Sequence, residues 1–199
     1  LENYPGFPAG VNSHRLLELI GEQADRAGCD RGEGRVVDLW ESAGGFVAET
    51  EDGRTLAASN VVAATKNTVD FLADVDGVEI LDRGKEFVDT DDRGRTGVAG
   101  LYAAGRLAAQ PHQAIIVAGH GATVGVTLIE DSDVEFYHDW VTPEGYFTDR
   151  GRDLPPGCEE IDDAERESRE AESVAVMQGR FAEPHPDEPQ QHPSVDDTG

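Results

Sequence analysis

Residues 97–105 read GVAGLYAAG, in which the apolar run Leu101–Ala104 stops at Gly105. A short, continuous apolar run is typical of a strand that is covered on both faces. Val61–Ala64 has the same character, and the pattern downstream predicts a long helix from about residue 111 to residue 129. Together these segments predict a buried parallel sheet packed against a helix, which is an α/β fold.

The segments before and after Val61–Ala64 are less apolar than this predicted strand. Residues 12–28 repeat apolar side chains at helical spacing, with Asn12 or Ser13 as the N-cap and Gly28 at the end, so they predict a helix. A three-stranded antiparallel meander is predicted by three alternating runs separated by glycine-containing turns, namely Arg35–Glu41, Phe46–Thr50 and Arg54–Ser59. From Lys66 to Gly97 the chain is polar, and we expect irregular structure.

The chain divides into an α/β domain and an acidic extension. The domain covers residues 1–130, and the extension covers residues 131–182. Within the extension we expect an irregular aromatic flap over residues 134–147 and an amphipathic helix over residues 162–181. Residues 183–199 are rich in Pro, acid and Gln and are expected to be disordered, because they cannot bury enough apolar surface to offset chain entropy.

Charge and composition exclude several classes of function. Asp and Glu number 41 against 16 Lys and Arg, a net charge of −25, so a phosphate backbone would be repelled and we expect no nucleic-acid partner. No apolar stretch reaches the roughly 20 residues of a membrane span, and no signal-peptide pattern is present. Cys29 and Cys158 are isolated from each other, which predicts neither a disulfide framework nor a metal site. We therefore expect a cytoplasmic protein that does not bind a membrane.

The acidity also suggests the solvent in which the protein works. Lys66 and Lys85 are the only lysines. Spread acidity with scarce lysine is typical of a halophilic protein in a cytosol at molar salt, where screening removes self-repulsion. A mesophilic protein with an acidic tail is the alternative.

Three segments in this order resemble the FAD-binding domain of the thioredoxin-reductase-like flavoproteins, which are pyridine nucleotide-disulfide oxidoreductases. The first is LENYPGFP at residues 1–8, and the second is the meander leading into VVAAT at residues 61–65. The third is GVAGLYAAG at residues 97–105, followed by PHQA at residues 111–114. The resemblance covers about residues 1–130 and implies a Rossmann-like, FAD/NAD(P)-binding fold with FAD as the cofactor.

The resemblance implies a flavin site built from all three segments. Asn3 would contact the flavin through its amide, and Gly105 would let the backbone approach the cofactor closely. The first amides of the downstream helix, near Gln113 and Ala114, would face the flavin and favour the negative charge of its reduced form. The cofactor-binding residues expected on this basis are Asn3, Thr65, Gly105, Arg106, His112, Gln113 and Ala114, and no catalytic residue is assigned.

The sequence departs from the family pattern in four ways. Arg106 replaces the usual aspartate and could pair with the FAD pyrophosphate, and His112 replaces an arginine and could titrate with the flavin. Only 31 residues separate Thr65 from Gly97, too few for an NAD(P)H domain, and the chain has no CxxC. It also has no strand–GxGxxG–helix unit and begins at a leucine, so it resembles a family member without its first βα unit.

A rival motif, GHGATVG, lies at residues 119–125 and mimics a dinucleotide fingerprint, with Asp139 20 residues after Gly119. Too little helical sequence follows Val124, and no further βαβ unit is predicted, which argues against this motif. In the favoured interpretation these glycines let the helix pack closely against the sheet.

The sequence thus predicts a single-domain FAD-dependent oxidoreductase of the thioredoxin-reductase-like type, without dithiol chemistry. We expect an unidentified redox partner or small-molecule substrate, and a homodimer is left open. The alternative is a non-catalytic module, flavin-binding or flavin-less, that serves protein interaction. Arg106 and the missing GxGxxG unit favour the module, whereas Asn3 and Pro111–Ala114 favour the enzyme.

We predict that the thermal stability of the chain rises steeply from low to molar KCl. Its carboxylates repel one another over a Debye length of about 10 Å at 0.1 M salt but only about 3 Å at 1 M. Thermal melts across this range measure the effect, and a flat response would contradict the halophilic assignment.

Overall fold

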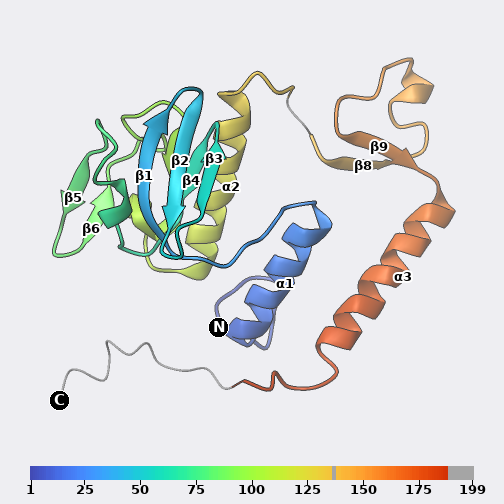
Figure 1. The fold of residues 1–199 in the computed structure, drawn as a ribbon. Coiled ribbons are helices and arrows are strands. Elements are labelled where there is room, and N and C mark those ends of the chain that lie inside the picture. The colour runs from blue at the N-terminus through green and yellow to red at the C-terminus, as the bar shows by residue number, and fades with distance from the viewer. Residues whose placement is uncertain (136–137, 188–199) are drawn as a thin grey trace. The chain divides into compact units, whose positions relative to one another are not determined.

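The computed structural model describes residues 1–135 and 138–187 and divides the chain into two compact units (Figure 1). The central unit comprises residues 32–135, and the terminal unit comprises residues 1–31 together with residues 136–199. No sequence signal indicated that the N-terminal residues group with the C-terminal part. The predicted boundaries at residues 130 and 182 stay a prediction.

The central unit contains the predicted antiparallel meander. Its strands follow one another in the sheet in the order β1 (Val36–Ser42), β2 (Gly45–Thr50) and β3 (Thr55–Ala58). Leu39 and Phe46 are buried in the hydrophobic core. Gly45 has a φ of +146°, and a Cβ there would collide with the Ala58 carbonyl oxygen, so the first turn requires glycine.

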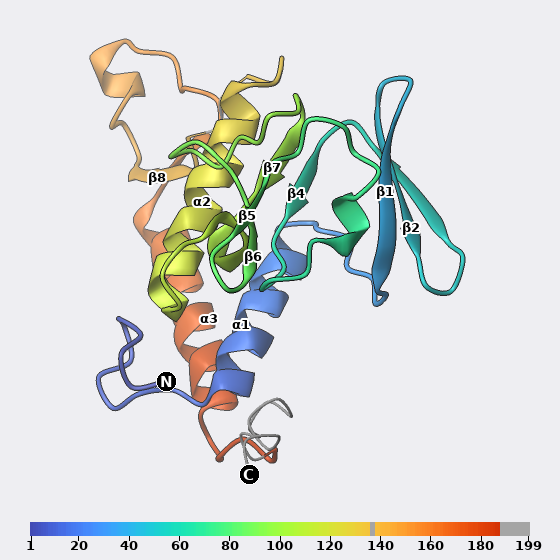
Figure 2. The ribbon, with the colours of Figure 1, turned by 90° about the vertical axis from the view of Figure 1, so that its left-hand side faces the viewer.

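The predicted parallel strands are also present. β4 (Val61–Ala63) pairs in parallel with β7 (Leu101–Ala103), with Val61 opposite Leu101. Figure 2 shows this pair between the meander on one side and helix α2 (Ala114–Glu130) on the other. Leu101 and Ala103 are fully buried in the core shared with the meander, and Tyr102 packs against α2 through Val124. The central unit is therefore a mixed α/β structure.

The crossover between β4 and β7 is more regular than predicted. Where the sequence indicated irregular structure, the chain forms a 3-10 helix and a hairpin, η1 (Asp70–Leu72), β5 (Ile80–Asp82) and β6 (Glu86–Val88). The apolar side chains of this segment, among them Phe71, Leu72 and Val88, are buried in the core. Acidic residues lie within one or two positions of these apolar side chains in the sequence, so no helical or strand periodicity is visible.

Hydrogen-bonded ion pairs fix the C-terminal end of α2 to the loop before β7. Arg95 donates from Nε and Nη2 to the Asp131 carboxylate at 2.6 and 2.7 Å. The Tyr102 hydroxyl donates to the same carboxylate at 3.0 Å, and Arg93 pairs with Glu130. The Arg95 guanidinium holds the pKa of Asp131 below its ordinary value. The helix is thus held at its polar end by charge and along its length by packing.

The start of α2 approaches the turn after β7 closely. This turn is the 3-10 helix η2 (Gly105–Ala108), and Gly105 has a φ of +63°. A Cβ at Gly105 would lie 3.3 Å from the Cβ of Val117, and the left-handed backbone adds a second requirement for glycine.

The predicted close packing of the α2 glycines is wrong. A Cβ at Gly119, Gly121 or Gly125 would meet no atom within 4 Å. From Ala114 to Ile129 the helix carries no Asp, Glu, Lys or Arg. Yet its apolar side chains are not all covered, since Ile115, Ile116 and Val126 are about 40% exposed.

The terminal unit is built on the two other predicted helices, α1 (Ser13–Arg26) and α3 (Asp163–Arg180). Each begins at a side-chain cap. Asn12 Oδ1 accepts from the His14 amide, and Asp162 Oδ1 accepts from the Glu165 amide, both at 2.8 Å. These caps satisfy amides that have no acceptor inside the helix.

Ion pairs join α1 and α3 in antiparallel order. Arg26 donates to Glu172 at 2.9 Å, and Arg180 donates to Glu22 at 2.7 Å. Because all four side chains are partly exposed to solvent, each pair adds little to stability.

A short strand lies within residues 134–147, where the sequence predicted an irregular aromatic flap, and it pairs in parallel with a strand further along the chain. β8 (Trp140–Pro143) pairs with β9 (Cys158–Ile161). The connection between them contains the 3-10 helix η3 (Thr148–Arg150). Residues 136 and 137 of the predicted flap lie outside the described residues.

Glu160 of β9 organises the connection between β8 and β9. Its carboxylate accepts from the Thr148 hydroxyl at 2.7 Å and from the amides of Thr148 and Gly145, both at 3.0 Å. The amide of Phe147 is a further donor. The Thr148 hydroxyl and these amides lower the pKa of Glu160 to about 2.

Only part of the predicted disordered tail is described. Residues 188–199 lie outside the described residues. In residues 183–187, His185 Nε2 lies 3.0 Å from Glu18 Oε1 on α1, and the amide of Asp187 donates to His185 Nδ1 at 3.0 Å. The described part of the tail therefore contacts α1 instead of extending freely.

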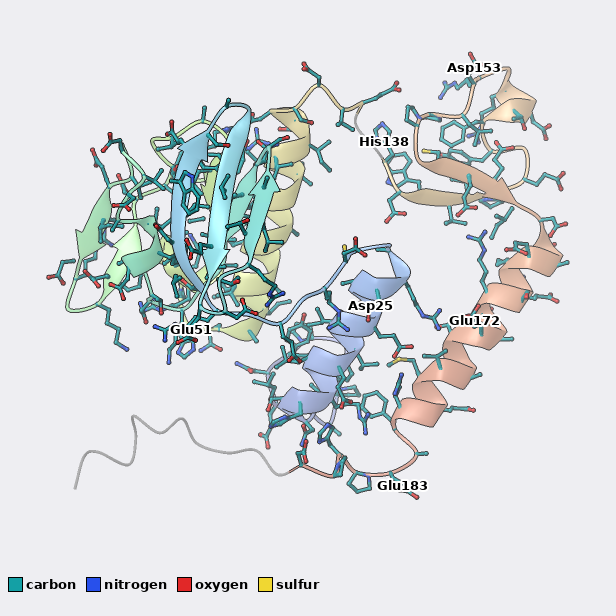
Figure 3. The ribbon with its side chains drawn as sticks, viewed as in Figure 1. Asp25, Glu51, His138, Asp153, Glu172 and Glu183 are labelled. Carbon is teal, nitrogen blue, oxygen red and sulfur yellow. The ribbon has the colours of Figure 1, made fainter. Side chains whose placement is uncertain are left out.

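Acidic side chains are exposed on both units. Figure 3 labels Asp25, Glu51, Asp153, Glu172 and Glu183, which are all exposed. Across residues 1–135 and 138–187, no helix combines the length and the apolar character needed to cross a bilayer.

Replacing Glu160 with Gln should loosen the loop that it organises. A carboxylate whose pKa falls from 4.5 to about 2 on folding stabilises the fold above about pH 4.5, and this stabilisation is lost as the pH falls through about 2. At pH 7 we expect the amide hydrogens of Phe147 and Thr148 to exchange about tenfold faster in Glu160→Gln. Glu144→Gln, at an exposed position before the same loop, is the matched control. Equal protection in Glu160→Gln and the parent at pH 7 would contradict this role.

Two glycine substitutions should change the free energy of unfolding in opposite directions. Gly105→Ala places a side chain on a left-handed backbone against Val117 and should destabilise the chain by about 1–2 kcal/mol. Gly119→Ala adds a methyl group to open space in a helix and should stabilise it by about 0.5–1 kcal/mol. Urea unfolding measures both. Destabilisation by Gly119→Ala, or none by Gly105→Ala, would show that α2 packs differently.

Candidate functional site

The carboxyl edge of the parallel pair brings several predicted residues together. Ala63 lies opposite Ala103, and the Ala104 amide donates to the Ala63 carbonyl at 2.8 Å. Thr65 and Gly105 each follow these strands by two residues, so the parallel pairing carries both to one edge of the sheet. In open α/β sheets this edge is the usual place for a ligand.

Gly105 makes its close approach to α2. Its amide donates to Nδ1 of His120 at 2.9 Å, in addition to the contact with Val117. The observed close approach is to α2, whereas the predicted close approach of Gly105 to the cofactor stays a prediction. The contact fixes the position of α2 relative to the carboxyl edge.

The N-terminus of α2 has no side-chain cap. The helix begins at Ala114, with Gln113 as an extended N-cap residue that makes no capping hydrogen bond and no acidic residue in the first turn. The amide of Val117 donates to the Gln113 carbonyl at 3.0 Å, so the amides before it have no acceptor within the helix. Pro111 precedes the helix instead of entering its first turn. Such an end favours a negatively charged or electron-rich group.

The Arg106 side chain makes its contacts close to the turn in which it lies. Its Nη1 donates to the Gln110 carbonyl at 2.8 Å, and the guanidinium stacks on the Phe87 ring, 4.7 Å from the centroid. The carbonyl and the ring hold the side chain against the protein. Pairing of Arg106 with a pyrophosphate stays a prediction.

The other predicted residues differ in their surroundings. Thr65 donates from its hydroxyl to the Thr68 carbonyl at 2.8 Å, and His112 is exposed. Asn3 belongs to the terminal unit, whereas the other predicted residues belong to the central unit. Within the central unit, the structure thus brings together Thr65, Gly105, Arg106 and the start of α2. Contact of Asn3 and His112 with a flavin stays a prediction.

The rival dinucleotide fingerprint is wrong. Residues 119–125 lie inside α2, where the backbone is helical and no strand precedes them. A fingerprint needs a glycine loop between a strand and a helix, so that amides can surround a pyrophosphate. Residues 119–125 cannot do this because their amides are used within the helix.

His120 is the residue that the sequence analysis missed. Its side chain is buried at 9% exposure, Nδ1 accepts from Gly105, and Nε2 has no hydrogen-bond partner among the described residues. Burial lowers the pKa of this imidazole. A histidine within an uncharged helix was the only sequence signal, and it was read as part of the rival motif.

Within residues 1–135 and 138–187, no three His, Cys, Asp or Glu side chains are arranged to hold a metal ion. Cys29 and Cys158 are both free thiols.

The comparisons with known proteins rest on structure. No protein-family model matches the sequence, and no curated protein matches it. A ferredoxin-flavin thioredoxin reductase from Clostridium acetobutylicum matches with a TM-score of 0.50 and 13% identity, over 66% of this chain and 82% of that chain. The atypical thioredoxin reductase TRi from Desulfovibrio vulgaris Hildenborough matches with a TM-score of 0.52 and 16% identity, over 66% of this chain and 84% of that chain.

At these identities the likeness concerns the fold alone. The mixed α/β structure with its three-stranded antiparallel sheet corresponds to the fold of these reductases. Over about two thirds of its length, this chain therefore resembles the thioredoxin reductases in structure, which confirms the resemblance predicted from its sequence.

Proposed function

We propose that this chain is part of an FAD-dependent oxidoreductase of the thioredoxin-reductase-like type, and that the central unit holds the flavin. One observation carries the proposal: the uncapped N-terminus of α2 lies beside the turn at Gly105, on the carboxyl edge of a parallel pair, in a fold similar to that of the thioredoxin reductases. This combination favours an electron-rich ligand at that edge.

The residues at the edge suit the flavin ring better than the rest of FAD. The amides of Ala114 and the following residues would hold the ring, and the dipole of the 17-residue helix would stabilise negative charge on its reduced form. Bound flavin would supply the electron transfer, and the protein would supply its placement. The 199 residues contain no GxGxxG loop for the diphosphate. We therefore expect weak binding of FAD by this chain alone.

The proposal assigns no dithiol to the reaction. Cys29 lies in the terminal unit beyond α1, and Cys158 begins β9, with neither in a CxxC. Electrons would thus pass between the flavin and a separate redox partner or small molecule. A homodimer is compatible with this scheme.

One observation favours a flavin-less interaction module instead. Gly105 donates its amide to His120, and Arg106 is held by Gln110 and Phe87, so two predicted cofactor contacts are already made within the protein. Titration of the chain with FAD separates the two functions, because only the oxidoreductase requires flavin to bind.

A capping substitution tests the role of the helix N-terminus. Gln113→Asp should raise stability by about 0.5–2 kcal/mol, because an aspartate at the N-cap accepts from first-turn amides that have no acceptor within the helix. The same carboxylate competes with the flavin for those amides and repels its reduced form, so FAD affinity should fall about tenfold. Urea unfolding and quenching of flavin fluorescence measure the two effects.

Asn60→Asp is the matched control, since it adds the same charge at an exposed position at the opposite edge of β4. FAD affinity should be unchanged in this variant. Parent-like affinity in Gln113→Asp, despite the gain in stability, would place the flavin elsewhere. No binding of FAD by the parent would contradict the proposed function.

A further inference from the structure

The central unit contains a buried donor without an acceptor. Among the side chains that the structure describes, His120 Nε2 is the one buried nitrogen or oxygen with no hydrogen-bond partner. Native proteins pair nearly all buried polar groups, because an unpaired one loses its hydration without compensation. A single exception in an otherwise satisfied interior calls for a partner from outside the described chain.

The protonation of the ring follows from its one hydrogen bond. Nδ1 accepts from the Gly105 amide at 2.9 Å, so Nδ1 carries a lone pair. Burial lowers the pKa of the imidazole and keeps it neutral near pH 7. The neutral ring must then carry its hydrogen on Nε2. His120 therefore presents an N–H donor that no described residue accepts.

The position of this donor coincides with the candidate site. Gly105, to which the ring is bound, ends the edge of the parallel pair that also carries Thr65. Nε2 is separated from Nδ1 by a single ring carbon, so it lies close to Gly105.

We propose that His120 donates a hydrogen bond from Nε2 to an oxygen of bound flavin nucleotide and thereby positions it. The inference rests on the proposed function and names a residue for it. His120 would act as a positioning residue, with Gly105 fixing the ring through Nδ1.

Two isosteric variants separate the two nitrogens of His120. In His120→Asn the short amide can offer its oxygen near the position of Nδ1, so the Gly105 amide keeps an acceptor while the donor at Nε2 is lost. In His120→Gln the longer amide reaches the position of Nε2, so the donor is kept while Gly105 loses its acceptor. We expect His120→Asn to unfold like the parent but to bind FAD about tenfold more weakly. His120→Gln should be less stable but should bind FAD more tightly than His120→Asn does.

His14→Asn makes the same change at a histidine of the terminal unit and should leave FAD affinity unchanged. Riboflavin is titrated beside FAD. A loss of affinity for both ligands in His120→Asn places the acceptor on the ring or the ribityl chain, and a loss for FAD alone places it on a phosphate. Either result supports the proposal.

Nitrogen-15 NMR of the imidazole in the parent provides a readout that does not depend on the variants. FAD should protect the Nε2 hydrogen of His120 from exchange with solvent, and the Nδ1 signal should stay that of an acceptor. Unchanged exchange, or equal FAD affinity of His120→Asn and the parent, would reduce His120 to a core histidine with a bridging water only. If the parent itself binds no FAD, the proposed function fails together with this inference. If the parent binds and His120→Asn binds equally well, this inference alone fails.

Discussion

Three residue pairs join β4 to β7 in parallel, and the central unit is arranged around them. Parallel strands need a crossover and are stable only when both faces are covered. The crossover supplies Phe71 and Leu72 to the core on the side of the meander, while Val124 of α2 covers Tyr102 on the other side. The pairing also decides which residues share an edge. Thr65 and Gly105 are distant in sequence and lie at the same edge of the sheet because of this register.

Charge has different uses in the two units. In the terminal unit, exposed ion pairs such as Arg26 with Glu172 join α1 and α3, although each contributes little free energy. In the central unit, Arg95 and Asp131 form two hydrogen bonds in addition to their charge interaction, and Tyr102 joins them. That geometry fixes the C-terminal end of α2, whereas its N-terminal end has no side-chain cap. Most of the acidic side chains, by contrast, interact with solvent.

The elements predicted correctly are those whose signal lies within a few residues. Asn12 as a cap indicates α1, the amphipathic pattern indicates α3, and alternation with glycine turns indicates the meander. β5 and β6 were missed because three-residue strands between acids carry too short a pattern. The pairing of β8 with β9 was missed because it depends on the loop that Glu160 organises, which no local propensity encodes.

The contrast between local signals and long-range packing also decides which features of the candidate site could be predicted. The end of the strand at Gly105 was predicted from a local signal, the apolar run that stops there. That the partner of Gly105 is α2, and that His120 is buried against it, depends on long-range packing. The rival fingerprint at residues 119–125 failed for the opposite reason, because a short motif matched while its structural context was a helix.

The uncharged surface of α2 has a consequence for handling the protein. Chloride salts would screen the repulsion between carboxylates and leave Ile115, Ile116 and Val126 at the surface. Sulfate or phosphate would screen the same repulsion but would also raise the cost of keeping these side chains in water. At the same ionic strength, a chloride salt therefore keeps the chain dispersed. A sulfate or phosphate salt favours association of chains through the exposed face of α2.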